Sequence, residues 1–318
     1  MNLHLNKKTF KQFITKISIE NKIDEDIIEK DYYVCCILEE LSKVQDDLQT
    51  YFKGGTAIYK ILNNMHRFSE DIDLTVKGVL EEESKTSAKK RLIKSVLNYN
   101  VNGLALDKSS INRIKDTSLI ANYNYNSMYK LENDLQRFGR VMIEATSYTV
   151  SEPFDTYVIE PLIYKLASDS EKEILKQKFE VSSFNINVIK IERMFVDKIF
   201  AAEYYYVRNE YFDTSKHIYD LTVLFNYEPI KKLLSNKEEI NKLINCKRIE
   251  EKSRKGGISD EIKLQDFEYL KLDFDTNMEN AFKSMQKKYV FKDEFKISID
   301  EVKNILSKLL DILYKYDI

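Results

Sequence analysis

The chain has 318 residues, enough for one large domain or two lobes with a substantial core. Hydrophobic residues make up 43%, which excludes a disordered protein. Lys plus Arg total 50 and Asp plus Glu total 52, so the formal charge is −2 and argues against nonspecific coating of nucleic acid. A local basic groove is still compatible with that total. The 7 glycines and 3 prolines favour regular structure, chiefly helix.

The three cysteines are Cys35, Cys36 and Cys246, and their spacing fits neither a disulfide framework nor a zinc site. This usage is typical of a reducing cytosol. The N-terminus lacks the apolar core of a signal peptide, and no window reaches the ~18 apolar residues of a membrane span. We therefore expect a soluble, cytoplasmic protein without a membrane partner.

The first part of the chain alternates between helical and strand-like patterns. Helical periodicity or a charged surface pattern predicts helices over residues 9–19, 24–44, 56–64 and 81–98. Alternating or short apolar runs predict strands over residues 48–52, 72–76, 118–126, 139–150 and 184–189. From Glu192 onward the pattern is helical nearly to the end. We therefore expect a mixed α/β lobe over residues 1–185 and a helical lobe over residues 186–318.

A glycine turn, Lys53-Gly54-Gly55-Thr56, follows the first predicted strand. Two glycines between a strand and a helix let the backbone approach a polyphosphate closely, while the N–H groups of the helix start point outward. Thr56 can add a hydroxyl donor. Gly-Gly-Thr is also common in ordinary turns, so the turn needs a second feature before it indicates a nucleotide site.

Two carboxylates supply that second feature. Asp71 and Asp73 lie two apart on a predicted strand, so both project from the same face while Ile72 points into the core. Paired hard oxygen ligands beside a phosphate cradle suit Mg²⁺ or Mn²⁺ bridging nucleotide phosphates. Asp-x-Asp alone is more often a solvated strand face. The joint arrangement of strand, Gly-Gly, helix and Asp-x-Asp strand favours a metal and phosphate site.

These segments resemble the signature of the DNA polymerase β-type nucleotidyltransferases. More closely, they resemble the AbiEii/AbiGii toxin family, in which a Lys-Gly-Gly-Thr-Ala turn precedes Arg-Phe-Ser-x-Asp-Ile-Asp-Leu. Here the two parts are residues 53–57 and 67–74. Further matches are Glu29-Lys30-Asp31-Tyr32-Tyr33-Val34, Glu192 with Asp197-Lys198-Ile199, and residues 216–221. The resemblance spans roughly residues 27–225.

The resemblance implies an α+β protein, with a mixed sheet in a nucleotidyltransferase-fold lobe followed by a mostly helical lobe. It implies a toxin of a toxin–antitoxin or abortive-infection system that transfers a nucleotide from an NTP, with Mg²⁺ or Mn²⁺ as cofactor. The implied acceptor is RNA, in particular the tRNA 3′ end, the implied outcome is growth arrest, and the implied partner is a cognate antitoxin. Two alternatives stay open: a phosphotransferase or protein-modifying enzyme on the same fold, and a catalytically silent binding module.

The resemblance also assigns residues of the helical lobe to the catalytic cleft. The sequence around Lys198 is an apolar helix, which by itself indicates a lysine reaching out to the surface. The resemblance instead implies that Lys198 stabilises charge on the leaving pyrophosphate. It also implies that Asp220 orients Lys198 or the incoming group. His217 departs from the family pattern, because many relatives have Asp at this position.

Several residues have two interpretations each. Glu144 lies mid-strand among apolar residues and is either a third carboxylate that activates the attacking hydroxyl or a paired structural acid. Arg67 and Ser69 either bind phosphate or brace the turn. The same two roles are open to Lys53, for which bracing is favoured.

The aromatic run Tyr204-Tyr205-Tyr206 suggests base stacking, yet successive helix positions face different directions. We therefore expect at least one of these rings to pack in the core. His66 and His217 are interpreted as polar surface residues, since two distant histidines have no metal-site spacing.

Overall fold

The computed structural model describes residues 1–318 except 63–65, 81–82, 115, 130–137, 150, 255, 272–273 and 317–318. The chain forms two compact units, which we call the sheet unit (Met1–Asn64 with Ser69–Ile189) and the helical unit (Met65–Phe68 with Lys190–Ile318). In the described part of the chain, no helix combines the length and the apolar character that crossing a bilayer requires.

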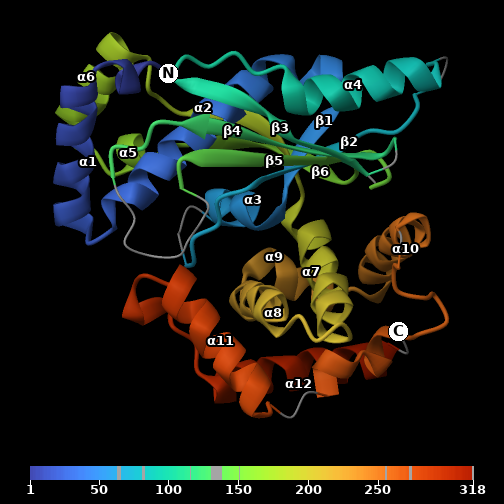
Figure 1. The fold of residues 1–318 in the computed structure, drawn as a ribbon. Coiled ribbons are helices and arrows are strands. Elements are labelled where there is room, and N and C mark those ends of the chain that lie inside the picture. The colour runs from blue at the N-terminus through green and yellow to red at the C-terminus, as the bar shows by residue number, and fades with distance from the viewer. Residues whose placement is uncertain are drawn as a thin grey trace. The chain divides into compact units, whose positions relative to one another are not determined.

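The strands of the sheet unit form one mixed sheet in the order β3-β4-β5-β2-β1-β7-β6 (Figure 1). The strands are β1 (Thr50–Lys53), β2 (Ile72–Val76), β3 (Leu104–Ile114), β4 (Ser118–Tyr125), β5 (Arg140–Thr146), β6 (Phe154–Ile159) and β7 (Phe184–Ile189). β2 is antiparallel to β1 and parallel to β5, and β1 is parallel to β7. The remaining pairs, β3 with β4, β4 with β5 and β6 with β7, are antiparallel.

Helices cover this sheet. They are η1 (Leu3–Leu5), α1 (Lys7–Asn21), α2 (Glu25–Leu48), α3 (Gly54–Ile61), α4 (Lys85–Leu97), α5 (Leu162–Lys165) and α6 (Asp169–Phe179). α2 and α4 contact each other and the sheet, and Figure 1 shows α4 on one side of the sheet and α3 on the other. Ile72, Leu74 and Val76 of β2 are fully buried, as the alternation along a strand requires when one face packs in the core.

The helical unit contains α7 (Ile191–Tyr206), α8 (Tyr211–Phe225), α9 (Glu228–Leu234), α10 (Lys237–Ser253), η2 (Leu264–Asp266), η3 (Glu268–Lys271), α11 (Thr276–Tyr289), η4 (Asp293–Phe295) and α12 (Ile299–Tyr316). α7 packs along α8, and α8 also packs against α11 and α12. The short stretch before the carboxylate strand belongs to this unit, since the Phe68 amide donates to the Tyr289 carbonyl at 2.7 Å.

The mixed sheet followed by helices confirms the predicted α+β class. The predicted helices and strands are present with shifted ends. The predicted helix start at Thr56 is wrong, because α3 begins at Gly54 and both glycines form its first turn. Of the predicted ranges, residues 63–64, 81–82 and 150 lie outside the described residues.

Three elements escape the sequence patterns for a common physical reason. β3 and β6 are the two edge strands of the sheet, and most of their side chains are at least partly exposed. α6 is a surface helix in which only Leu175 is buried, and it begins with a capping box formed by Ser168 and Glu171. Elements with little buried surface carry weak apolar periodicity, so burial patterns do not reveal them.

Candidate active site

The glycine turn is shaped around a carboxylate. Gly54 has φ +85°, in the left-handed region that favours glycine. A Cβ at this position would lie 2.0 Å from Oδ2 of Asp73. The first glycine is therefore required locally, because it lets the Asp73 side chain approach the start of α3, where helix N–H groups favour negative charge.

The strand register gathers charged side chains on one face of the sheet. Asp73 is the register partner of Lys53 on β1 and of Glu144 on β5, and paired residues project from the same face. Asp71 directly precedes β2, two residues before Asp73. All four side chains are half-buried, whereas Ile72 on the opposite face is fully buried. The structure thus places Glu144 beside Asp73, with Asp71 two residues before Asp73 in the chain.

The donor chemistry of this face fits a hard divalent cation. Carboxylate oxygens are the ligands that Mg²⁺ prefers, and such ions are commonly bound by one or two carboxylates together with substrate phosphates. In the described residues, no group of three or more His, Cys, Asp or Glu side chains is arranged to hold a metal ion unaided. Asp71 and Asp73 would therefore share the ion with phosphate oxygens, and their metal role stays a prediction.

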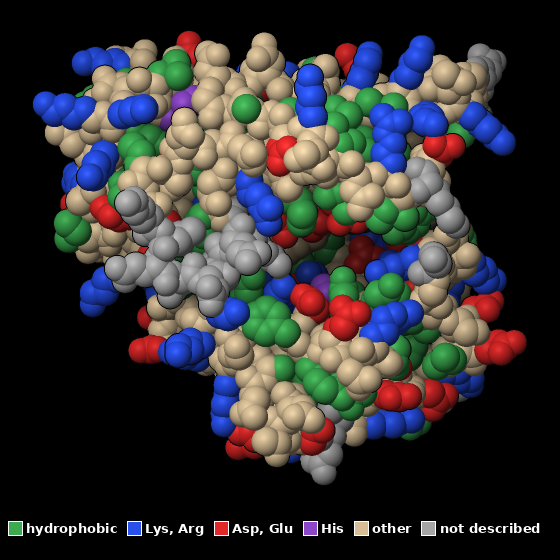
Figure 2. Space-filling model, viewed as in Figure 1, with side chains coloured by type: hydrophobic (Ala, Val, Ile, Leu, Met, Phe, Trp, Pro, Cys, Tyr) green, Lys and Arg blue, Asp and Glu red, His purple; other side chains and the backbone are tan. Residues whose placement is uncertain are grey.

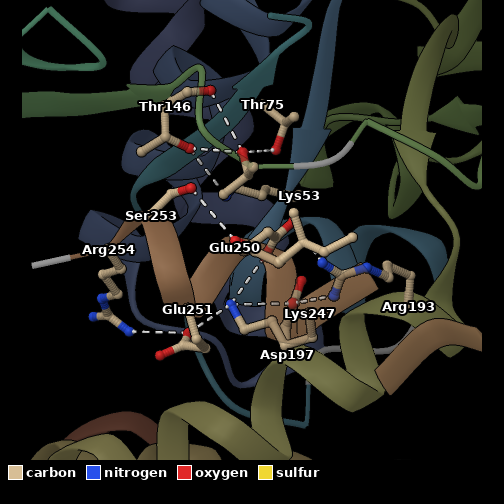
Figure 3. Close-up of polar contacts among 12 residues, drawn as sticks. Lys53, Thr75, Thr146, Arg193, Asp197, Lys247, Glu250, Glu251, Ser253 and Arg254 are labelled. Carbon is tan, nitrogen blue, oxygen red and sulfur yellow. Dashed lines mark hydrogen bonds and ion pairs between the residues drawn. The ribbon is translucent and has the colours of Figure 1, made fainter. Parts of the chain in front are cut away.

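Thr56 and Ser69 brace the approach to the strand. The Thr56 hydroxyl donates to the Asp71 carbonyl at 2.7 Å and lies 3.1 Å from Ser69 Oγ. Thr56 is buried, so these bonds fix the backbone at Asp71. Lys53 donates to Thr146 Oγ1 on β5 at 3.3 Å, and Figure 3 shows this contact beside Thr75.

A cluster that sequence reasoning left without a role lies in α2. Glu29, Lys30 and Asp31 are 0%, 1% and 6% exposed, although successive helix positions point in different directions. Lys30 Nζ lies 4.0 Å from Glu70 Oε2, immediately before Asp71, and donates to the Arg140 carbonyl at the start of β5. Lys30 therefore ties together the two strands that carry the candidate carboxylates.

The neighbours of Lys30 hold other segments. Asp31 pairs with Lys60 of α3 at 2.5 Å and accepts from the Leu162 amide at 2.7 Å. Glu29 accepts from the Met128 amide at 2.9 Å. The signal that could have revealed this role was the run of three charges inside the otherwise apolar stretch 27–38 of α2, since buried charges in proteins are paired.

The helical unit holds a second charged cluster. Arg67 donates to both carboxylate oxygens of Asp220, with both distances 2.7 Å, and Lys198 lies 2.7 Å from Asp220 Oδ2. Arg67, Lys198 and Asp220 are 4%, 7% and 0% exposed. Burial opposes ionisation of Asp220, but the charges of Arg67 and Lys198 outweigh it and hold the pKa of Asp220 well below its ordinary value. The structure thus pairs Arg67 with Asp220, which the sequence did not suggest.

His217 adjoins this cluster, and both histidines lie less openly at the surface than the sequence predicted. His66 and His217 are half-buried, and burial lowers the pKa of each. For His217 the lowering is strong, because the Lys198 charge adds to burial. Its Nδ1 atom is buried and has no hydrogen-bond partner in the described part of the structure.

The expectation that one tyrosine of the 204–206 run packs in the core is also wrong. All three rings are half-buried, while Ala202 and Glu203 just before them are buried. The run lies at the end of α7, where the helix emerges from its packed neighbours.

A further ion network fixes α10 to α7. Lys247 lies 3.0 Å from Glu250, 3.1 Å from Glu251 and 3.5 Å from Asp197 (Figure 3). Arg193 pairs with Glu250 at 2.5 Å and also with Asp197. Asp197 adjoins Lys198 in the chain, so this network helps to hold the turn of α7 that presents Lys198.

A mixed sheet with an Asp-x-Asp strand against a Gly-Gly turn is the arrangement that the sequence predicted for a nucleotidyltransferase, and the family comparison agrees. The sequence model of the family "Nucleotidyl transferase AbiEii toxin, Type IV TA system" matches residues 36–303. The chain therefore belongs to this family of nucleotidyltransferase toxins from type IV toxin–antitoxin systems. No curated protein matches the sequence.

Two solved structures are similar to this one. One is MenT4, a nucleotidyltransferase toxin from Mycobacterium tuberculosis, with 11% identity and a TM-score of 0.41 over 93% of this chain and 97% of that chain. The other, from H. pylori, is described as a candidate nucleotidyltransferase, with 16% identity and a TM-score of 0.36 over 84% of this chain and 99% of that chain.

Proposed function

We propose that this protein transfers a nucleotide from an NTP to the 3′-hydroxyl of an RNA acceptor, the tRNA 3′ end in particular. The observation that carries the proposal is the short segment from Arg67 to Asp73. Its first residue forms the buried pair with Asp220, and Asp71 and Asp73 follow within six residues on the carboxylate strand. One segment therefore links both charged clusters, which supports assigning them to one reaction.

The reaction requires that one bond forms and one breaks. The acceptor hydroxyl oxygen bonds to the α-phosphorus of the NTP, the bond from that phosphorus to the bridging oxygen breaks, and pyrophosphate leaves. Glu144, in register with Asp73, would accept the proton of the acceptor hydroxyl. Lys198 would stabilise the charge that develops on pyrophosphate, and Asp220 would hold Lys198 in place.

Asp71 and Asp73 would hold Mg²⁺ or Mn²⁺, which when bound neutralises phosphate charge and polarises the phosphoryl oxygens. The turn formed by Gly54, Gly55 and Thr56 would lie against the phosphates with its backbone N–H groups. We assign Lys53 and Ser69 to bracing this turn rather than to direct phosphate contact, because Lys53 bonds Thr146 and Ser69 contacts Thr56.

The family supports the biological part of the proposal. A nucleotide added to the tRNA 3′ end blocks aminoacylation, because that end carries the hydroxyl to which the amino acid is joined. Growth arrest would follow, and a cognate antitoxin would be the protein that restrains this activity. Its family places the chain in a toxin–antitoxin system.

Incubation with total cellular RNA, Mg²⁺ and each NTP in turn tests this function, with the label on either the α- or the γ-phosphate. We expect α-label to appear in RNA and pyrophosphate to be released. Transfer of γ-label would instead show a phosphotransferase, and α-label in protein would show a protein-modifying enzyme. Either of those results, in place of labelled RNA, contradicts the proposal.

A further inference from the structure

The end of α7 carries a tyrosine held between two arginines. The guanidinium carbon of Arg208 lies 3.6 Å from the ring centre of Tyr204, and that of Arg254 lies 3.5 Å from it. Two guanidinium groups this close to the centre must lie on opposite faces of the ring, since one face has no room for both. The three planar groups therefore form a stack in which the outer face of each guanidinium is turned away from the tyrosine.

A second stack continues from the first. The rings of Tyr204 and Tyr205 meet edge to face, with centres 5.3 Å apart, and Tyr205 stacks on His217 at 5.3 Å with planes 15° apart. His217 precedes Asp220 by one turn of α8, and Lys198 lies 2.7 Å from Asp220. We call Arg254, Tyr204, Arg208, Tyr205 and His217 the planar ladder. It leads from the surface toward the proposed active-site residues of the helical unit.

The arginines of the ladder are held in place but keep their charge. Arg208 donates to the Tyr204 carbonyl at 2.6 Å and to the Gly256 carbonyl at 2.7 Å. Carbonyl oxygens fix a guanidinium without neutralising it. Within the described part of the chain, Arg254 pairs with the carboxylate of Glu251, which is 3.8 Å away and is also held by Lys247 at 3.1 Å. Arg208 is exposed, so its charge and its outer plane are accessible.

Such a surface matches the chemistry of single-stranded nucleic acid. Bases stack on aromatic rings and on guanidinium planes, and fixed positive charge attracts phosphates. The face drawn in Figure 2 mixes Lys and Arg with Asp and Glu, in keeping with the formal charge of −2, so a nucleic-acid site on this protein has to be local. The ladder is a local site of this kind.

We propose that the planar ladder binds the single-stranded 3′ end of the RNA acceptor and guides it toward Lys198 and Asp220. This inference rests on the proposed function for the identity of the acceptor. It adds the surface that recognises the acceptor, and it assigns stacking rather than base-specific hydrogen bonding as the principal means of recognition. His217 would stack beneath the terminal base.

Binding without catalysis tests the ladder. The probe is a fluorescein-labelled single-stranded oligoribonucleotide of about 12 nucleotides ending in CCA, titrated with full-length protein in EDTA without NTP and followed by anisotropy at fixed ionic strength. We expect Arg208→Ala and Tyr204→Leu to raise Kd at least about tenfold. Arg208→Lys keeps the positive charge but removes the planar guanidinium group, so it should still weaken RNA binding.

Lys252→Ala is the matched control. Lys252 lies on α10 near Arg254, is exposed and pairs with Asp260 at 2.7 Å, so its loss removes a charge without disturbing a stack. It should leave Kd unchanged. Thermal unfolding of each variant shows whether it is folded, and Arg208→Lys changes only an exposed side chain.

Three results would overturn the inference: no binding by the native protein, equal binding by all variants, or the same loss for Lys252→Ala as for Arg208→Ala. The proposed function fails separately. If the ladder variants lose RNA binding but the native protein transfers no α-label to RNA, the ladder is supported as an RNA-binding surface and the proposed nucleotide transfer is contradicted. If native protein and ladder variants label RNA with the same KM for RNA, the proposed nucleotide transfer is supported and the role of the ladder in RNA binding is contradicted.

Discussion

The carboxylate face of the sheet unit and the Arg67–Asp220–Lys198 cluster of the helical unit are both charged, but they differ in how that charge is balanced. The first combines Asp71, Asp73 and Glu144 with Lys53 and is half-buried. The second places one carboxylate between two cations and is almost completely buried. The carboxylate face has an excess of negative charge that suits a bound cation. The cluster has an excess of positive charge that suits a phosphate.

This difference has consequences for substitution. Backbone register and a glycine position the half-buried carboxylates, so removing one changes chemistry and leaves packing intact. Mutual ion pairing positions the buried cluster, so removing one member leaves a charge unpaired in a poorly solvated site. We therefore expect the first region to respond mainly in activity and the second mainly in stability.

The largest expected effect is on the stability of the helical unit. Asp220→Ala leaves Arg67 and Lys198 buried without their counter-ion and should lower the free energy of unfolding by about 3–5 kcal/mol. Urea denaturation measures it. Asp213→Ala is the control on the same helix, because its pair with Lys216 is partly exposed and should be worth no more than about 1 kcal/mol. If both variants lost the same free energy of unfolding, the buried cluster would not be held by ion pairing more strongly than a partly exposed pair is.

The next effect is on activity alone. Asp73→Asn keeps the size of the side chain but removes its charge, and should reduce nucleotide transfer at least about 100-fold while the unfolding midpoint stays close to native. Asp107→Asn is a control on edge strand β3, where the carboxylate accepts hydrogen bonds from the Ser109 amide and hydroxyl and lies outside the candidate site. Near-native transfer by Asp73→Asn would remove this residue from the metal site.

A smaller effect concerns the close approach at the turn. Gly54→Ala and Gly139→Ala both place a side chain at positive φ, which costs about 1–2 kcal/mol. At residue 139 the nearest atom to the new Cβ is 3.7 Å away, but at residue 54 it is Asp73 Oδ2 at 2.0 Å. Gly54→Ala should therefore lose more stability than Gly139→Ala and lose activity as well. If Gly54→Ala and Gly139→Ala had equal stability and equal transfer activity, the Asp73 side chain would be able to move away from residue 54 without loss of stability or activity.

The smallest effect is a pH dependence at His217. Burial and the Lys198 charge lower its pKa, against the opposing charge of Asp220, while Arg67 and Lys216 lower it further. Below about pH 6.5 the unfolded chain therefore binds a proton that the folded chain does not, so stability falls as pH drops. His217→Gln should remove about 1 kcal/mol of this fall by pH ~5.5. Parallel stability curves for the two proteins between pH 7 and 5.5 would contradict this assignment.

The two regions also differ in how far the sequence could predict them. The turn and the Asp-x-Asp strand lie within 21 consecutive residues, 53–73, so local spacing was enough to place them on one site. Arg67 and Asp220 are 153 residues apart, and no local pattern relates them. Resemblance pointed to Lys198 and Asp220, but the pairing of Asp220 with Arg67 appears only in the fold. Edge strands β3 and β6 were missed because their weak burial leaves little apolar alternation.

Local reasoning also failed where a helix leaves its packed surroundings. In mid-helix, three successive positions include at least one that faces the core. Tyr204, Tyr205 and Tyr206 instead lie in the last turn of α7, where all three are half-buried. In α2 the opposite applies, since the helix is buried on all sides around Lys30 and its charges are satisfied by distant segments. In both helices, the burial of a side chain depends on tertiary contacts, which local sequence patterns do not reveal.

The most direct test of the central claim is a double-mutant comparison of nucleotide transfer, since that claim is that both charged regions act on one NTP. Asp73→Asn, Lys198→Ala and the double variant are compared by kcat/KM for α-label transfer to RNA. Residues that act as a unit are strongly non-additive, so we predict that the double variant is no slower than the slower single variant. Losses that multiply in the double variant would contradict the account, because the two regions would then contribute to the reaction independently and not as one unit.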